Sequence, residues 1–336
     1  MTDSVRHRLP RLSPTPEIIY FNRRQFIQQL GVGAMSLAAS WAFALSGRYA
    51  RGELDSDEFN VFTPGLTHPK VLAKFPAPRN HGFDHLPGNV CKLTEARVAA
   101  THNNFYEFRP GSAGNLWPMT EQFVTDPWVV EVTGLCHKPR KFGIDDLFTL
   151  PGLEQEERTY RFRCVEAWAM DVPWTGFELG KLLKKVEPKS NAKFVRLITA
   201  NMPEQMPGIT SDPYYPWPYF EGLRMDEAMH ELTLLVTGIY ARPLPRQHGS
   251  PFRLIVPWKY GYKSIKSIVK IELLETQPKT FWETIAPTEY PFESNVNPKV
   301  PHPRWSQVSE TILGTGARRP TLYLNGYANL VGGLYA

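Results

Sequence analysis

Six segments of the chain are rich in β-branched and aromatic residues and are bounded by proline, glycine or asparagine, a pattern typical of β-strands. They are Trp128–Gly134, Tyr160–Cys164, Lys193–Thr199, Leu232–Gly238, Phe252–Pro257 and Ser267–Glu275. Apolar residues at helical spacing predict short helices at Phe142–Leu150 and Phe177–Val186. Because strands and helices do not alternate regularly, the pattern predicts an α+β fold of mixed sheets and short helices, and the 31 prolines indicate many loops.

The start of the chain has a different pattern. Arg23 and Arg24 precede an uncharged apolar segment, Leu30–Ala44, that ends in the small-x-small sequence Ala42-Phe43-Ala44. This combination predicts a twin-arginine signal peptide, residues 1–44, with cleavage after Ala44 preferred to cleavage after Ala50. The apolar segment is shorter than the roughly 20 residues that span a bilayer, so an uncleaved anchor is the weaker alternative, as is a chance arginine pair before a buried helix. The motif usually has Ser or Thr where Asn22 stands.

Two further regions follow the predicted signal peptide. Residues 45–95 are rich in Pro, Gly, His and Asn and show little periodicity, which predicts an extended N-terminal arm. No Pro/Ser linker interrupts the chain between residues 95 and 290, so residues 96–336 are predicted to form one catalytic domain. Five arginines and two acidic residues leave with the signal peptide, and the formal charge falls from +5 to +2. This balance does not favour nucleic acid as a partner.

The signal and the cysteines together indicate a cofactor enzyme. The twin-arginine pathway exports folded proteins to the periplasm, and it suits enzymes that receive a cofactor in the cytoplasm. Only three cysteines are present, Cys91, Cys136 and Cys164, with no CxxC pair, so a disulfide framework is not expected. At least one thiol is left unpaired, and a metal ligand is one explanation. Haem-attachment, iron–sulfur and dinucleotide motifs are absent from the sequence, so electrons must come from a redox partner.

Two segments carry candidate chemistry near the middle of the chain. Cys164 ends a predicted strand between Arg161 and Arg163 on one side and Trp168 and Trp174 on the other, and the flanking arginines could favour a thiolate. A buried core cysteine is the alternative. The segment THNNFYEF, residues 101–108, offers polar side chains in a loop-like region, with a turn and edge strand as the alternative.

A third segment, residues 248–268, is basic. Arg253, Lys259, Lys263 and Lys266 lie in or beside a loop rich in Gly, Pro and aromatic residues between two predicted strands. Their charges are therefore expected to converge on one anion, for which a phosphate group is suited, whereas the alternative is a solvated basic loop.

THNNFYEF, RFRCVEAWAM and PWKYGYKSIKSI together resemble the sulfite-oxidase superfamily of molybdenum enzymes, and most closely its periplasmic branch of methionine-sulfoxide reductases. The resemblance runs from about Pro76 to the C-terminus. It implies a sulfite-oxidase-type molybdopterin-binding fold and one molybdenum–molybdopterin cofactor per chain, with Cys164 as the catalytic residue and protein ligand of the metal. The cofactor-binding residues that it implies are Asn103, Tyr106, Glu107, Thr199, His248, Arg253, Ser264, Ile265 and Lys266. His248 stands where relatives have Asn, while Cys91 and Cys136 match nothing in the pattern and are expected to be structural.

The same resemblance implies an activity. We expect reduction of methionine sulfoxide in oxidised periplasmic proteins by oxygen-atom transfer, with Tyr106 and Trp168 as candidates for an apolar wall around the substrate. A haem-containing membrane subunit fed by the respiratory chain is the expected electron donor. Sulfite dehydrogenase is the nearest alternative, but only 61 residues follow Glu275, too few for the additional immunoglobulin-like domain of sulfite oxidases. An exported zinc protein, with His81, His85, Cys91 and Cys136 as ligands, lacks the usual tight ligand pairs.

Overall fold

The computed structural model describes residues 61, 64–84, 93–111 and 113–336, all within the second of the two structural units of the chain, Ala44–Ala336. The predicted signal peptide, His85 and Cys91 lie outside these residues. The three predicted domain boundaries therefore stay predictions. Within the described ranges, no helix has the length and apolar character needed to cross a membrane.

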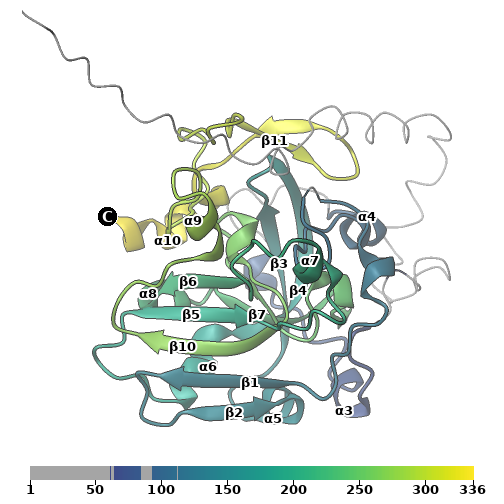
Figure 1. Ribbon diagram of the computed structural model, residues 1–336, viewed down its shortest axis with the longest axis vertical. Helices are drawn as coiled ribbons and strands as arrows, with labels where there is room; N and C mark the ends of the chain where they lie inside the picture. The colour runs from purple at the N-terminus through teal and green to yellow at the C-terminus, as the bar shows by residue number, and fades with distance from the viewer. Residues whose placement is uncertain (1–60, 62–63, 85–92, 112) are drawn as a thin grey trace, which may run out of the picture. The chain divides into compact units, whose positions relative to one another are not determined.

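Five strands form the first sheet, in the order β2-β1-β10-β5-β6 (Figure 1). Their bounds are Arg140–Gly143 (β2), Val129–Gly134 (β1), Ile268–Leu274 (β10), Phe194–Thr199 (β5) and Phe220–Arg224 (β6). Strands β1 and β10 are parallel and the other neighbours are antiparallel. Buried and partly exposed residues alternate along β5, so one face of the sheet covers the core. The predicted strands near residues 128–134, 193–199 and 267–275 are confirmed.

The second sheet carries the turn that contains Cys164. Strands β12-β11-β4-β7-β8 follow one another, β3 also pairs with β4, and β9 pairs with β7. Their bounds are Arg318–Pro320 (β12), Ser309–Ile312 (β11), Trp168–Glu178 (β4), Leu234–Ile239 (β7), Arg242–Pro243 (β8), Glu156–Arg163 (β3) and Arg253–Ile255 (β9). The predicted strands near residues 160–164, 232–238 and 252–257 are confirmed as β3, β7 and β9, although β3 begins earlier and ends one residue before Cys164.

The long central strand β4 is not predicted by the sequence pattern. Pro173 and Gly176 are poor strand formers, yet β4 is buried along nearly its whole length between β3 and β7. A Cβ atom at residue 176 would lie 2.3 Å from the carbonyl oxygen of Leu235, so the close pairing of β4 with β7 requires glycine there. Burial on both faces therefore outweighs local propensity in this strand.

The helices are short and lie between the strands. They are α3 (Pro69–Leu72), α4 (Ala96–Thr101), α5 (Ile144–Thr149), α6 (Leu179–Lys185), α7 (Pro207–Ser211), α8 (Met225–Ala228), α9 (Phe281–Ile285) and α10 (Ala328–Val331). The predicted helices near residues 142–150 and 177–186 are confirmed as α5 and α6, each beginning two residues late because the preceding residues belong to β2 and β4. Mixed sheets with short helices confirm the predicted α+β fold.

The C-terminal segment reaches back to the middle of the chain. Strand β11 pairs in parallel with the start of β4, with Thr311 opposite Trp168. Figure 1 shows β11, in yellow, at the end of the β3–β4 pair. The β3–β4 turn therefore lies beneath a segment that comes more than a hundred residues later in the sequence.

Candidate functional site

Cys164 lies in the tight turn that joins β3 to β4. The Cys164 amide donates to the carbonyl of Trp168 at 3.0 Å, and the Ala167 amide donates back to the carbonyl of Cys164 at 3.1 Å. Ala167 has a left-handed backbone with φ of 67°, which lets the chain reverse within these residues. The Glu166 amide points at the Cys164 sulfur, 3.5 Å away. Cys164 is only 7% exposed, so the thiol is held in a fixed, nearly dry position.

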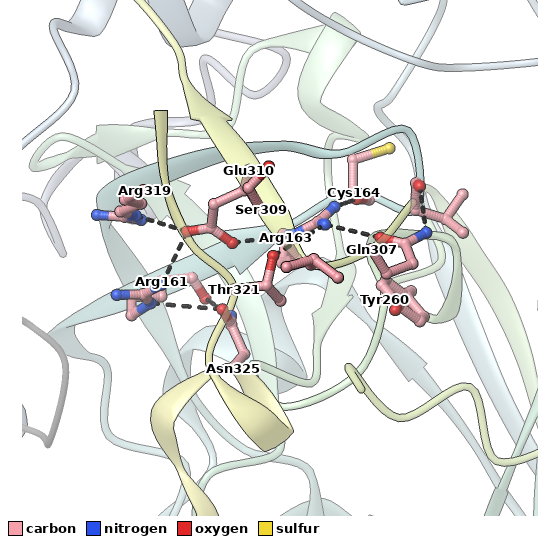
Figure 2. Close-up of polar contacts among 12 residues, drawn as sticks. Arg161, Arg163, Cys164, Tyr260, Gln307, Ser309, Glu310, Arg319, Thr321 and Asn325 are labelled. Carbon is pink, nitrogen blue, oxygen red and sulfur yellow. Dashed lines mark hydrogen bonds and ion pairs between the residues drawn. The ribbon is translucent and has the colours of Figure 1, made fainter. Parts of the chain in front are cut away.

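The arginines beside Cys164 are held by a carboxylate (Figure 2). Arg161 lies 2.8 Å from the Glu310 carboxylate, and Arg163 lies 2.9 Å from its other oxygen. Burial raises the pKa of the Cys164 thiol well above its usual value, with Glu166 adding to this effect and Arg163 opposing it more weakly. Arg163 therefore acts in the direction that the sequence suggested, but burial outweighs its effect on the pKa of the thiol.

The segment of residues 101–108 lies against the cysteine turn. Asn104 donates to the Glu166 carboxylate at 2.9 Å, and Trp168 donates to the other oxygen of the same carboxylate at 3.0 Å. Asn103 is fixed by its backbone pairing with Gly114 and by a 2.6 Å hydrogen bond from its side chain to the Ala100 carbonyl. Glu166 thus connects THNNFYEF to the turn that carries Cys164.

The basic loop separates into two pairs of cations. The Lys259 amine lies 2.6 Å from Glu227, and the Lys263 amine lies 2.9 Å from Glu221, with all four side chains buried. These two lysines therefore support the fold, and the expectation that all four cations converge on one anion is wrong for them. Arg253 differs, because among the described residues its hydrogen bonds go to the carbonyls of His248 and Ser264, at 3.0 and 3.3 Å.

Lys266 lies at the centre of the predicted cofactor-binding residues. Its amine donates to the Asn104 carbonyl at 2.6 Å, and its own carbonyl accepts from the Thr199 hydroxyl at 2.9 Å. Burial lowers the pKa of Lys266 and raises that of Glu107, while the attraction between the two groups opposes both shifts. The charge of Arg253 also lowers the pKa of Lys266, whereas the charge of Cys164 opposes this shift. Arg253, Glu107, Cys164 and Lys266 therefore influence one another electrostatically.

Several buried polar atoms around Lys266 lack a hydrogen-bond partner among the described residues. They are the Asn104 Oδ1, His248 Nε2 and Arg253 Nε atoms. Burial lowers the pKa of His248 well below its usual value, and the positive charges of Arg253 and Lys266 lower it further. Burial also lowers the pKa of Arg253, to about 9. Desolvated cations without a carboxylate partner are costly in free energy unless an anion binds. The donor set therefore fits a phosphate-bearing cofactor with Cys164 as a sulfur ligand.

The predicted site residues thus meet in one region of the molecule. Cys164, Thr199, His248, Arg253 and Lys266 are connected by the interactions above, and Asn103 precedes Asn104, which contacts both Glu166 and Lys266. Ser264 and Ile265 precede Lys266 in the same loop, where the Ile265 carbonyl accepts from the Leu254 amide at 2.8 Å. For the zinc alternative, the described residues contain no group of three His, Cys, Asp or Glu side chains that could hold a metal.

Aromatic side chains form a wall beside the cysteine turn. Tyr106 packs edge-on against Trp282 with ring centroids 5.0 Å apart, and Trp282 packs against Tyr290 at the same distance. Burial raises the pKa of the Tyr290 phenol, and the charges of Glu166 and Cys164 add to this shift. Trp168 packs against His102 instead, at 4.7 Å. The sequence pattern indicated Tyr106 and missed Trp282 and Tyr290, which lie on and just after α9 without a motif of their own.

Comparisons with known proteins show the family of this chain. Residues 117–282 match the family model described as an oxidoreductase molybdopterin-binding domain. The protein-methionine-sulfoxide reductase catalytic subunit MsrP of Burkholderia mallei (strain ATCC 23344) is 44% identical over 338 aligned residues, which cover 97% of this chain and 93% of that protein. The crystal structure of the sulfane dehydrogenase SoxCD from Paracoccus pantotrophus matches with a TM-score of 0.47 and 14% identity, covering 77% of this chain and 61% of that one. By its near full-length similarity to MsrP, the chain belongs to the family of protein-methionine-sulfoxide reductase catalytic subunits, which are molybdopterin-binding oxidoreductases.

Proposed function

We propose that this protein reduces methionine sulfoxide in oxidised proteins to methionine by oxygen-atom transfer, with one molybdenum–molybdopterin cofactor per chain. The observation that carries the proposal is the buried thiol of Cys164 near Lys266, a desolvated cation that in turn lies near Arg253. Arg253 is also desolvated and has no carboxylate partner in the described part of the chain. Membership in the reductase family supports the substrate class.

Residues of this chain would hold the cofactor from three sides. Cys164 would supply the sulfur ligand of the metal, and a bound metal offsets the burial that disfavours its thiolate. Arg253 with Ser264–Lys266 would hold the terminal phosphate, because backbone amides and cations converge in that loop. The remaining contacts would come from Asn103, Tyr106, Glu107, Thr199 and His248. The bound cofactor would supply the oxygen-accepting and two-electron chemistry that protein side chains lack.

The aromatic wall suits the side chain of methionine sulfoxide. Tyr106, Trp282 and Tyr290 present ring faces and edges in a buried position beside the cysteine turn. Sulfur-containing side chains pack favourably on aromatic rings, so the wall would orient the sulfoxide and exclude water from it. Tyr290 stays protonated in this setting because burial raises the pKa of its phenol.

The proposal also includes the electron donor of the protein and its location in the cell. The reduction of a sulfoxide to a sulfide and water consumes two electrons and two protons, and no further redox motif is present in the sequence. A second subunit is supported by the relative's designation as a catalytic subunit. We infer a haem-containing membrane subunit that delivers electrons from the respiratory chain, and folded export to the periplasm by the twin-arginine machinery.

The test measures molybdenum and activity in the purified protein and in two cysteine variants. Cys164→Ser is the test variant, and Cys136→Ser is the matched control because Cys136 is also a buried free thiol. We expect about one molybdenum per chain and oxidation of reduced viologen by methionine sulfoxide, both retained in Cys136→Ser, with activity abolished in Cys164→Ser. Sulfite oxidation with an artificial acceptor would favour the sulfite dehydrogenase alternative. A protein without molybdenum would refute both functions.

A further inference from the structure

We propose that Gln307 is a positioning residue for Cys164, holding the two residues that flank the thiol with its single side-chain amide. The Gln307 side chain accepts a hydrogen bond from the Arg163 guanidinium at 2.7 Å and donates one to the Val165 carbonyl at 2.7 Å. Gln307 is only 2% exposed, so water does not compete for either contact. Figure 2 shows this amide between Arg163 and the turn that carries Cys164.

The C-terminal segment gives the Val165 carbonyl a second donor, and the carbonyls of Ala167 and Cys164 are held by this segment and by Arg163. The Trp305 indole donates to the Val165 carbonyl at 2.7 Å, and the Thr311 amide donates to the Ala167 carbonyl at 2.8 Å. Arg163, which is itself bound by Gln307, donates to the Cys164 carbonyl. The backbone on both sides of the thiol is therefore fixed from outside the turn.

Gln307 differs from its neighbours in the hydrogen bonds of its side chain, which among the described residues involve only Arg163 and Val165. Trp305 also stacks on His302 with ring centroids 3.9 Å apart, and Glu310 pairs with Arg319 as well as with Arg161 and Arg163. Both hydrogen bonds of the Gln307 side chain, in contrast, end on residues adjacent to Cys164. Its replacement therefore tests the orientation of the thiol with little effect on the rest of the ion-pair network.

The expected consequence follows from the geometry of the turn. The Val165 carbonyl belongs to the peptide that carries the Glu166 amide, and this amide points at the Cys164 sulfur from 3.5 Å. If the carbonyl loses the Gln307 donor, it keeps the Trp305 indole, but one of the two hydrogen bonds that fix this peptide is gone. The peptide can then tilt and move the Glu166 amide away from the sulfur. A metal ligand that is misoriented by a fraction of an ångström loses much of its effect on the metal. The inference rests on the proposed function, in which Cys164 binds the molybdenum.

The experiment compares three variants of the full-length, cofactor-loaded protein. Gln307→Leu removes both contacts, whereas Gln307→Glu keeps the acceptor for Arg163 and removes only the donor to Val165, so it tests that contact even if Gln307→Leu does not fold. Gln155→Leu is the control, because Gln155 is a buried glutamine that donates to the carbonyls of Leu147 and Leu153, both at 3.4 Å. Gln155 precedes β3, so it lies about 30 Å from Cys164 along the extended strand.

We expect both Gln307 variants to shift the electron paramagnetic resonance spectrum of the molybdenum and to lower kcat by about tenfold or more, with KM within about twofold. Gln155→Leu should lower the melting temperature without changing the spectrum or kcat. Gln307 variants that melt no lower than Gln155→Leu but retain no molybdenum would also support the inference. A molybdenum-loaded Gln307→Leu protein with the wild-type spectrum and kcat would overturn it. Absence of molybdenum from the wild-type protein would instead refute the proposed function, and the inference with it.

Discussion

Replacement of Lys263 by methionine should strongly destabilise the protein. The Lys263 amine lies 2.9 Å from the Glu221 carboxylate, and both side chains are 1% exposed. The same amine donates to the Phe292 carbonyl at 2.9 Å. Lys263→Met leaves the carboxylate buried without its cation, with the Gly222 amide at 3.3 Å as a remaining donor. Removal of one partner of a buried ion pair costs about 3–5 kcal/mol in the free energy of unfolding, and we expect a loss in this range.

The loss should depend on pH. Burial raises the pKa of Glu221 above its usual value of 4.5, and Lys263 opposes this shift. Without the lysine the pKa of the folded state rises further, so folding takes up a proton between pH 4.5 and this raised pKa, and above it folding must bury an unpaired charge. The penalty is therefore largest at high pH and becomes smaller as the pH falls towards 4.5. Urea denaturation at about pH 8 and about pH 5.5 should show a larger loss at the higher pH.

Two controls distinguish a buried pair from a general charge effect. Lys263→Met combined with Glu221→Gln removes both charges and should recover most of the lost stability. Lys70→Met breaks the pair with Asp145, whose side chains are 62% and 54% exposed, and should change the unfolding free energy by less than about 0.5 kcal/mol. A loss below about 1 kcal/mol in Lys263→Met, or no recovery in the double variant, would refute the reasoning.

Three further predictions follow from other residues. Gly208→Ala places a Cβ atom 2.2 Å from the Tyr106 carbonyl and should cost about 1–3 kcal/mol in urea denaturation, whereas Gly332→Ala, with no atom within 4 Å of the new Cβ, should change stability little. Burial lowers the pKa of His102 from 6.5 to about 4, so the unfolded state binds the proton first and stability is lost as the pH falls through this range. Between pH 7 and pH 5, the free energy of unfolding should therefore fall by about 2 kcal/mol less in His102→Gln than in the wild type. An equal fall in both proteins, measured by urea denaturation, would contradict this. Arg253→Met should reduce the molybdenum content, measured by elemental analysis, by about tenfold, and unchanged content would exclude Arg253 from cofactor binding.

Strands with a regular local pattern could be predicted from the sequence. The runs around Val129–Gly134 and Phe194–Thr199 combine β-branched residues with alternating burial, and both form strands close to the expected bounds. Strand β4 could not be predicted in the same way, because Pro173 and Gly176 are unfavourable locally. Its strand conformation is imposed by β3 and β7, which pair with it on both sides.

The candidate site was predictable where its residues form compact motifs. Cys164, Asn103 and Lys266 belong to three such segments, and the structure brings these segments together. The sequence did not reveal that Lys259 and Lys263 are paired, because their partners Glu227 and Glu221 come from another part of the chain. Gln307 and Glu310 were missed for the same reason, since the parallel pairing of β11 with β4 creates their contacts.

The separation between Cys164 and the residues that hold its turn constrains the order of events during synthesis. Arg163 and Gln307 are 144 positions apart in the sequence, and Arg161 and Asn325 are 164 apart. A ribosome that has just translated Cys164 must therefore add most of the remaining chain before the partners of the turn exist. Until then the thiol belongs to an incomplete sheet whose turn carbonyls lack their donors. The mature geometry around Cys164 is therefore a property of the finished polypeptide, and a chain truncated before residue 305 cannot acquire it.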